Sequence, residues 1–255
     1  MTKPVKRIAL NTLYIIVVIA LVFAVWAVAA RIVDTPLIMP TVGDTFDALW
    51  IVVRLKTFWV GLVGTVVRSL IGYAVATALA FVLFFLSSLS DAAEHIITPI
   101  VAALRTLPTV AVSLVLVIWA GAVVAPVVLG VIVIAPMLYS TLRAKVATVT
   151  KELVEIARLN GAGNVRIFYH VVMPTAAGAL PEGLATALSF NIKIVIAAEI
   201  VMQTANSLGM LMNAAQIYYM TATLIALVVV AVVISVAIEY LVRWILSIAL
   251  VKYRD

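Results

Sequence analysis

The chain has 255 residues, of which 66% are hydrophobic and 11% are charged, and its formal net charge is +6. Soluble domains average roughly 45–50% apolar and about 25% charged residues, so this composition excludes a water-soluble globular domain and indicates a protein embedded in lipid. The chain contains no cysteine, which excludes disulfides, thiolate metal sites and cysteine nucleophiles. In a membrane protein, an excess of lysine and arginine marks loops on the cytoplasmic side, so the positive charge does not require a nucleic-acid partner.

The first apolar segment follows three basic residues and runs from Ile8 to Ala30. It has 23 residues, whereas the apolar core of a signal peptide has only about 7–15, so we expect an uncleaved first membrane span. Five more apolar segments follow. Because lipid offers the backbone no hydrogen-bond partner, we expect every span to be helical. The six predicted spans are residues 8–33, 69–88, 96–120, 126–142, 184–202 and 221–246.

A more polar stretch, residues 34–64, separates the first two predicted spans. Four of its apolar residues recur at helical spacing: Phe46, Leu49, Trp50 and Val53. This pattern predicts an amphipathic helix that lies at the membrane interface. Arg68 stands at the outer edge of the second span, where its long side chain is expected to snorkel toward water. Further along the chain, Gly121 is expected to end the third span and Pro126 to open the fourth.

The distribution of basic residues predicts the orientation of the chain. With six spans and a cytoplasmic N-terminus, 11 of the 17 lysines and arginines fall on the inner side and only 3 on the outer side. The inner set is Lys3, Lys6, Arg7, Arg143, Lys145, Lys151, Arg158, Arg166, Arg243, Lys252 and Arg254, and the outer set is Arg31, Arg54 and Lys56. Because basic loops are retained in the cytoplasm, we expect both termini and the loop of residues 143–182 to be cytoplasmic.

This cytoplasmic loop is the longest polar stretch in the chain. Its pattern predicts an amphipathic helix from Glu152 to Leu159, ended by Gly161 and Gly163, since glycine accepts the left-handed conformation that closes helices. A second helix, Val165–Val172, is expected to break at Pro174. Two helices joined by glycines outside the membrane form a surface suited to docking another protein.

The loop also carries a motif. Glu155-Ile156-Ala157 is followed after three residues by Gly161, and after nine more by Val171-Val172-Met173-Pro174. This resembles the cytoplasmic signature of the permeases of binding-protein-dependent ABC importers, which reads Glu-Ala-Ala, three residues, Gly, nine residues, Ile, one residue, Leu-Pro. The spacing matches throughout, and the three replacements are apolar. Segments 38–40, 65–72, 99–108 and 183–199 also look like the nitrate, sulfonate, taurine and bicarbonate branch of these permeases.

The resemblance implies an all-α polytopic fold of the type I ABC importer permease class, in a single membrane domain covering residues 1–255. It implies no catalytic residue and no cofactor, because ATP hydrolysis belongs to a partner. The implied partners are two ATPase subunits, a periplasmic or lipid-anchored binding protein, membrane lipid and a second permease copy in a homodimer. The chain would be a multi-pass protein of the bacterial inner membrane. The residues implied to couple to the ATPase are Glu155, Ala157, Gly161, Val171 and Pro174.

Four polar residues of the fifth predicted span are candidates for lining a translocation pathway: Ser189, Asn191, Lys193 and Glu199. A lone cation such as Lys193 is costly in the middle of a span and usually faces a cavity or a partner. The alternative for Lys193 is a buried ion pair, with Glu199 the nearest acid along the chain. Ser189 and Asn191 are alternatively interhelical hydrogen-bonding residues, and Glu199 fits a structural or gating role better than substrate contact.

Arg105 and Pro108 admit two interpretations: a kink with a charged contact, or a snorkelling arginine beside a tolerated membrane proline. For the whole chain, two other functions compete with an ABC permease. An ion-gradient-driven transporter would show internal repeats and paired broken helices, and an intramembrane enzyme would show a nucleophile or metal motif. We find no such pattern. The resemblance implies a substrate that is a small anion, such as nitrate, a sulfonate or bicarbonate, or a vitamin-precursor heterocycle.

Overall fold

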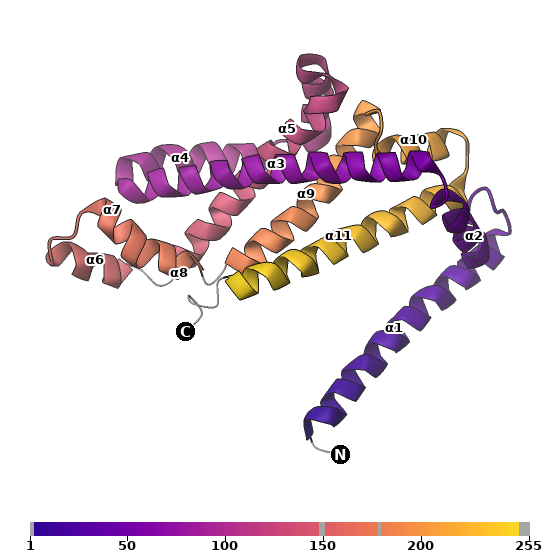
Figure 1. Ribbon diagram of the computed structural model, residues 1–255, viewed down its shortest axis with the longest axis horizontal. Coiled ribbons are helices and arrows are strands. Elements are labelled where there is room, and N and C mark those ends of the chain that lie inside the picture. Colours follow the sequence, from indigo (N-terminus) through magenta and orange to yellow (C-terminus); the bar gives the residue numbers. More distant parts are fainter. Residues whose placement is uncertain (1–2, 148–150, 178–179, 250–255) are drawn as a thin grey trace. The chain divides into compact units, whose positions relative to one another are not determined.

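The computed structural model describes residues 3–147, 151–177 and 180–249, and all regular structure within these ranges is helical (Figure 1). The predicted all-α class is therefore confirmed. The chain divides into two compact units, Met1–Trp59 with Leu211–Val230, and Val60–Met210 with Ala231–Asp255. Each unit is described by itself.

Within the described residues, five helices are long and apolar enough to cross a membrane. These are α1 (Lys3–Val33), α3 (Lys56–Leu89), α5 (Thr109–Ala147), α9 (Leu180–Met202) and α11 (Thr221–Ala249). The shorter helices are α2 (Val42–Val52), α4 (Asp91–Arg105), α6 (Lys151–Leu159), α7 (Asn164–Ile167), α8 (Met173–Ala177) and α10 (Leu208–Ile217), with one π-helical turn, η1 (Phe168–Val172).

Two helix boundaries differ from the sequence-based expectation. Helix α3 begins at Lys56 and not near Ser69, because residues 57–64 are mostly apolar and contain no proline. The predicted third span is divided between α4 and the start of α5, with a break at residues 106–108 before Thr109. This break lies at Pro108, because the residue before a proline is disfavoured in the helical region.

Helix α5 also runs through the expected boundary between the third and fourth spans. Its 39 residues would measure about 58 Å at 1.5 Å per residue, nearly twice the roughly 30 Å of a bilayer core. Gly121 is non-helical, with φ of 73° and ψ of 160°, so α5 consists of two helical segments, 109–120 and 122–147. The expected interruption at Gly121 is present, but without an intervening loop.

In the first unit, the connection between α1 and α2 is held by side-chain hydrogen bonds. The indole of Trp26 donates to the carbonyl of Pro40 at 3.0 Å. Thr41 caps α2 by accepting from the backbone N–H of Asp44, whose carboxylate accepts in return from the Thr41 N–H and hydroxyl. These two donated bonds lower the pKa of the Asp44 carboxyl. The capping box therefore starts the expected amphipathic helix, with Phe46 and Trp50 exposed on its surface.

In the second unit, α9 packs along α5, and the two helices lie side by side in Figure 1. Small side chains allow the neighbouring helices to approach closely: Ala76 and Ala80 of α3 and Ala187 of α9 are fully buried in one cluster with Ile134 of α5. Close packing of small residues is the usual basis of helix association in lipid, because lipid tails are as apolar as the helix surfaces and give no hydrophobic driving force for association.

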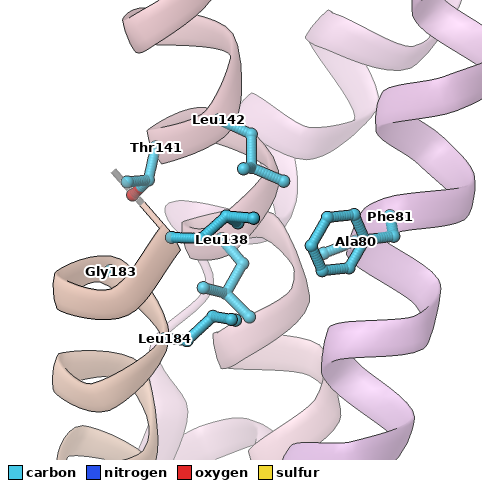
Figure 2. A pocket seen from close by; sticks show the side chains of 8 residues that line it. Ala80, Phe81, Leu138, Thr141, Leu142, Gly183 and Leu184 are labelled. Atoms are coloured by element: carbon cyan, nitrogen blue, oxygen red, sulfur yellow. The ribbon is translucent and has the colours of Figure 1, made fainter. Parts of the chain in front are cut away.

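A small apolar pocket remains between these three helices. Figure 2 shows side chains from α3 (Ala80, Phe81), α5 (Leu138, Thr141, Leu142) and α9 (Gly183, Leu184) gathered around it. Its volume is about 10 Å³, at the lower limit of the space that one water molecule needs. The pocket is therefore a packing defect at the α3–α5–α9 junction and holds no solute.

A proline in α5 creates a specific requirement for a partner. Pro126 has no N–H, so the carbonyl of Ala122, four residues earlier, lacks its helical hydrogen bond. The buried hydroxyl of Thr204 donates to this carbonyl at 2.7 Å. Thr204 lies just after the end of α9, between Gln203 and Asn206, which both have positive φ. The loop after α9 is therefore tied to α5 at the point where α5 resumes after Gly121.

We expect Thr204→Val to lower the free energy of unfolding by about 1–3 kcal/mol, because a buried carbonyl loses its donor. The same substitution should cost less in a Pro126→Ala background, where the restored N–H of residue 126 supplies the bond. Thermal unfolding of the purified protein, followed by tryptophan fluorescence, measures both effects. Equal costs in the two backgrounds would contradict the assignment.

Candidate coupling loop and buried charge network

Helix α6, in the loop of residues 143–182, has two distinct faces. Val154 and Ala157 are half-buried against a core cluster that includes Ile167, Phe168 and Val172. The opposite face exposes three large apolar side chains, with exposed fractions of 48%, 55% and 83% for Leu153, Ile156 and Leu159. An exposed apolar patch of this kind usually marks a contact with another molecule.

The end of α6 explains two positions of the motif. Gly161 has a φ of +76°, the left-handed conformation. Its N–H donates to the carbonyl of Arg158 at 2.9 Å, and the N–H of Ala162 donates to the carbonyl of Ala157 at 3.0 Å. This pair of bonds is a Schellman motif, in which glycine is favoured because a side chain is penalised at positive φ. Gly161 itself is exposed, with no atom near the position that a Cβ would take.

The second loop helix differs from the expectation. Residues 164–177 do not break at Pro174 but continue as α7, the π-helical turn η1 and α8. The N–H of Met173 bonds to the carbonyl of Phe168, five residues earlier. A π-turn widens the helix before Pro174, which relieves the clash between the proline ring and the carbonyl four residues back. Val171 and Pro174 are half-buried here.

The five expected coupling residues therefore fall into two groups. Ala157, Val171 and Pro174 are half-buried on the inner side of the loop, whereas Glu155 and Gly161 are exposed. Glu155 lines an open groove of about 790 Å³ together with Arg158, residues at the α3–α4 connection and the end of α5. Asn164 holds the loop to this connection by donating from its amide to the Leu89 carbonyl at 2.7 Å.

A second cluster of functional groups lies at the other end of the second unit. The carboxylate of Glu199 is fully buried and accepts from the Arg68 guanidinium at 2.6 Å. Its other oxygen accepts from the Thr65 hydroxyl at 2.7 Å and from the N–H of Gly209 at 3.3 Å. Arg68 does not snorkel as expected but is the ion-pair partner of Glu199, so within the described residues Glu199 does not pair with Lys193.

This cluster joins four segments of the chain. Arg68 also donates to the carbonyls of Ala205 and Asn206, at 2.8 and 3.0 Å, and the Thr65 hydroxyl accepts from the N–H of Leu208 at 2.9 Å. A Cβ on Gly209 would lie 2.4 Å from the Cβ of Glu199, so only glycine permits this approach. We call Thr65, Arg68, Glu199 and Gly209 the charge clamp; it holds α3, α9, the loop after α9 and the start of α10 together.

Asn191 and Ser189 are also buried, with exposed fractions of 0% and 2%. The Asn191 amide donates to the carbonyl of Ser69 at 2.7 Å, which links α9 to α3. Within the described part of the chain, the amide oxygen of Asn191 has no hydrogen-bond partner. The geometry of Asn191 is that of an interhelical contact, the second of its two expected roles; a pathway role for either residue stays a prediction.

Lys193 is the one expected pathway residue that is exposed. It lies near the centre of α9, on a single stripe of exposed residues formed by Glu182, Thr186, Phe190, Lys193, Ala197 and Val201. Among the described residues no acidic side chain lies within ion-pairing distance of it. Helix α9 thus has a buried side that carries Asn191 and Glu199 and a free side that carries Lys193.

Sequence reasoning did not find Thr65 and Arg68 as partners of Glu199, because they lie 134 and 131 residues away. One pattern pointed to them: an isolated arginine and an isolated glutamate, each near the end of an apolar span, are each too costly in lipid without the other. For the residues that the structure describes, no group of three or more His, Cys, Asp or Glu side chains is placed to hold a metal ion.

Among the described residues, five helices are long and apolar enough to cross a membrane, which is typical of a multi-pass membrane protein. The sequence profile of the family described as "binding-protein-dependent transport system inner membrane component" matches residues 85–248, more than half of the chain. The chain therefore belongs to this family. It is a multi-pass permease component of an ABC importer in the inner membrane, and it is not an enzyme.

The chain is similar to the taurine transport system permease protein TauC of Escherichia coli (strain K12), with 26% identity over 224 residues, covering 84% of this chain and 80% of TauC. Among solved structures, it resembles an amino acid ABC transporter with histidines at a TM-score of 0.58 and 16% identity, covering 81% and 96% of the two chains. It also resembles the inward-facing MetNI methionine ABC transporter, with a TM-score of 0.56 and 20% identity, covering 79% of this chain and 96% of that chain. These likenesses show the type I permease fold.

We expect Glu199→Gln to lower the free energy of unfolding by about 3–5 kcal/mol, because it leaves the Arg68 guanidinium without a carboxylate. The double variant Arg68→Gln, Glu199→Gln should lose less than the sum of the two single variants. Thermal unfolding of the purified proteins completes this double-mutant cycle.

The matched control is Glu182→Gln, which removes an exposed acid from the same helix. It should leave the unfolding temperature almost unchanged. If Glu199→Gln is as stable as Glu182→Gln, the charge clamp does not hold the helices together.

Proposed function

We propose that this permease couples to a separate ATPase through the loop of residues 143–182. The observation that carries the proposal is the apolar outer face of α6, where Leu153, Ile156 and Leu159 are exposed next to Glu155 and Gly161. The inner face of the same helix is fixed by packing and by the Schellman motif, so the outer face is a rigid docking surface. Such a surface transmits displacement of a docked ATPase to α8 and α9.

The loop lies in the cytoplasm in this proposal, together with both termini. The support is the 11-to-3 distribution of basic residues and an even number of crossings. Because Gly121 divides α5, residues 109–120 together with α4 make one crossing and residues 122–147 the next. Six crossings place both termini on the same side, whereas five unbroken crossings would separate them.

We expect Gly161→Asp to abolish co-purification of the ATPase and the ATP hydrolysis that substrate stimulates, while the permease still inserts into the membrane. At positive φ, an added side chain costs about 1 kcal/mol, too little to unfold the chain. A carboxylate buried in the docked surface costs several kcal/mol more unless it is paired. The measurements are affinity co-purification and ATPase assays in reconstituted vesicles.

Two controls separate the charge from the backbone effect. Gly161→Asn has nearly the shape of Asp, tolerates positive φ and carries no charge, so it should keep most of the coupling. Gly163→Asp places the same charge at an N-cap with φ of −72°, where Asp is favoured. Gly163→Asp should therefore keep ATPase binding, and wild-type binding and ATP hydrolysis in Gly161→Asp would overturn the proposed docking surface.

The translocation pathway, in this proposal, lies between two copies of the chain and is lined by the exposed stripe of α9. A charged lysine near the centre of a span costs about 2.5–3.5 kcal/mol when it faces lipid, and no acid among the described residues neutralises Lys193. Water in a pathway between the copies removes this cost. A homodimer supplies the second wall of such a pathway.

The chain contains no cysteine, so single cysteines test this placement directly. We expect Lys193→Cys to react with a charged, water-soluble thiol reagent in vesicles and to cross-link two copies through a short bis-maleimide. Thiols react as thiolates, so a cysteine in lipid stays unlabelled. The control is Val22→Cys in α1, where the valine is 60% exposed and faces lipid in this proposal. Equal labelling at both positions would contradict the pathway.

The substrate that fits these features best is a small anion such as a sulfonate. The relative TauC is named for taurine transport, and the candidate pathway carries in Lys193 a cation that has no acidic partner among the described residues. A vitamin-precursor heterocycle finds no support in the described residues of the stripe, where the one aromatic side chain is Phe190. Membership of an ABC importer family also removes the alternative of an ion-gradient-driven carrier.

A further inference from the structure

The loop of residues 143–182 contacts α3 through one aromatic side chain. Phe168, the first residue of the π-turn η1, is 6% exposed. Its ring centroid lies 4.9 Å from that of Phe85, in an edge-to-face arrangement, and 5.8 Å from that of Phe84. Such aromatic pairs have a specific geometry and stabilise a contact beyond the burial of their area. In the part of the chain that the structure describes, these are the only ring contacts that join segments far apart in the sequence.

The three rings lie in the apolar cluster that also supports α6. Phe84 is fully buried there, together with Leu142 at the end of α5. Val154 of α6 packs against the same cluster. Because protein interiors are close-packed, a shift of one member of such a cluster displaces its neighbours. A displacement of α6 therefore reaches the ring of Phe168 and, through that ring, α3.

The end of α3 also receives a polar contact from the loop. Leu89, its last residue, accepts a hydrogen bond from the Asn164 amide. One turn earlier, the hydroxyls of Ser87 and Ser88 both donate to the carbonyl of Phe84. Serine hydroxyls that bond back to a helix carbonyl weaken the helix locally and bend it. The polar contact therefore acts on a softened last turn, whereas the aromatic contact acts where that turn begins.

Helix α3 connects the aromatic contact to the charge clamp. Phe85 and Arg68 belong to the same 34-residue helix and lie about 26 Å apart along it, at 1.5 Å per residue. This helix contains no proline, the usual cause of a sharp kink. A shift at Phe85 is therefore transmitted to Arg68, which holds the loop after α9 through the carbonyls of Ala205 and Asn206.

We propose that Phe168 is the positioning residue through which the docked loop moves α3 and, with it, the charge clamp. This role rests on the coupling loop proposed above and adds a path to α3 beside the path to α8 and α9. The side chain of Phe168 is buried beneath the docking surface, so it does not itself contact the docked ATPase. Its loss should therefore leave docking intact and interrupt the movement that follows docking.

A fluorophore beside the charge clamp tests this role in the complex of the permease with its ATPase. The chain has no cysteine, so Ala205→Cys, at an exposed position of the loop after α9, accepts one environment-sensitive thiol label. ATP with vanadate, which traps the ATPase, should change the fluorescence when Phe168 is present. Phe168→Ala should lower the ratio of switched to unswitched complexes about tenfold, within the range by which residues along such a path alter coupling. Co-purification of the ATPase and basal ATP hydrolysis should stay unchanged.

Val101→Ala is the matched control, because Val101 is buried in the same cluster with an exposed fraction of 3% but lies in α4. Its ratio should stay within about twofold of the wild type. Phe85→Leu, which removes the partner ring from α3, should also lower the ratio, whereas Asn164→Ala should have a smaller effect. An equal ratio in Phe168→Ala and the control would overturn the proposal. Loss of ATPase co-purification in Phe168→Ala would overturn it too, because Phe168 would then only support the docking surface.

If Phe168→Ala does not fold, Phe168→Leu and Phe85→Leu decide in its place, and an unchanged ratio in both overturns the proposal. Failure of the docking loop itself is measured separately, because Gly161→Asp would then keep the ATPase in co-purification, which does not involve the fluorophore. Failure of the α3 link alone gives a different result: Gly161→Asp loses the ATPase as expected, while the fluorescence change survives Phe168→Ala.

Discussion

The ion pair between Arg68 and Glu199 is the interaction on which the arrangement of the second unit depends. In hydrocarbon, neither a charged group nor a backbone carbonyl finds a partner outside the protein, so each must be satisfied by another segment of the chain. Glu199 is satisfied by α3 and by the first residues of α10, and Arg68 by the carbonyls after α9. The carbonyl that Pro126 leaves free draws Thr204 to α5. The need to satisfy buried polar groups thus fixes the loop after α9 against the two long helices α3 and α5.

The sequence predicted the fold class and the loop helix α6 because both follow from local patterns: apolar runs, amphipathic spacing and glycine at a helix end. It did not predict where α3 begins. Residues 57–64 are mostly apolar, but the pattern groups them with Lys56 and the polar stretch before it and so predicts a loop. The charge clamp was also missed, because Arg68 and Glu199 meet only when α3 packs on α9. Asn191 lies in helix α9, within the stretch expected to be helical, but its partner is the backbone carbonyl of Ser69, and a pattern of side chains cannot predict a backbone partner.

The family motif becomes intelligible as two sets of physical roles. Ala157 and Gly161 belong to one Schellman motif, residues 157–162, in which the small residue at 157 packs inward and glycine at 161 takes positive φ. Val171 and Pro174 belong to a π-turn and the helix that follows it, which fill the core under α6. Glu155 remains exposed without a structural task, as a docking role requires. Spacing in the motif thus reflects the length of α6 and the distance to the supporting core.

The coupling proposed above also needs a rigid path from the loop to the spans. Helix α9 supplies it, because its length of 23 residues corresponds to about 34 Å, enough to cross the bilayer. Near its start it packs with α5 around the small pocket, and near its end Glu199 joins it to α3 and α10. In the middle of α9, the hydrogen bond from the Asn191 amide to the Ser69 carbonyl restricts movement of α9 relative to α3. In the coupling proposed above, displacement of the loop moves α9 together with α3, and the Lys193 stripe moves with α9.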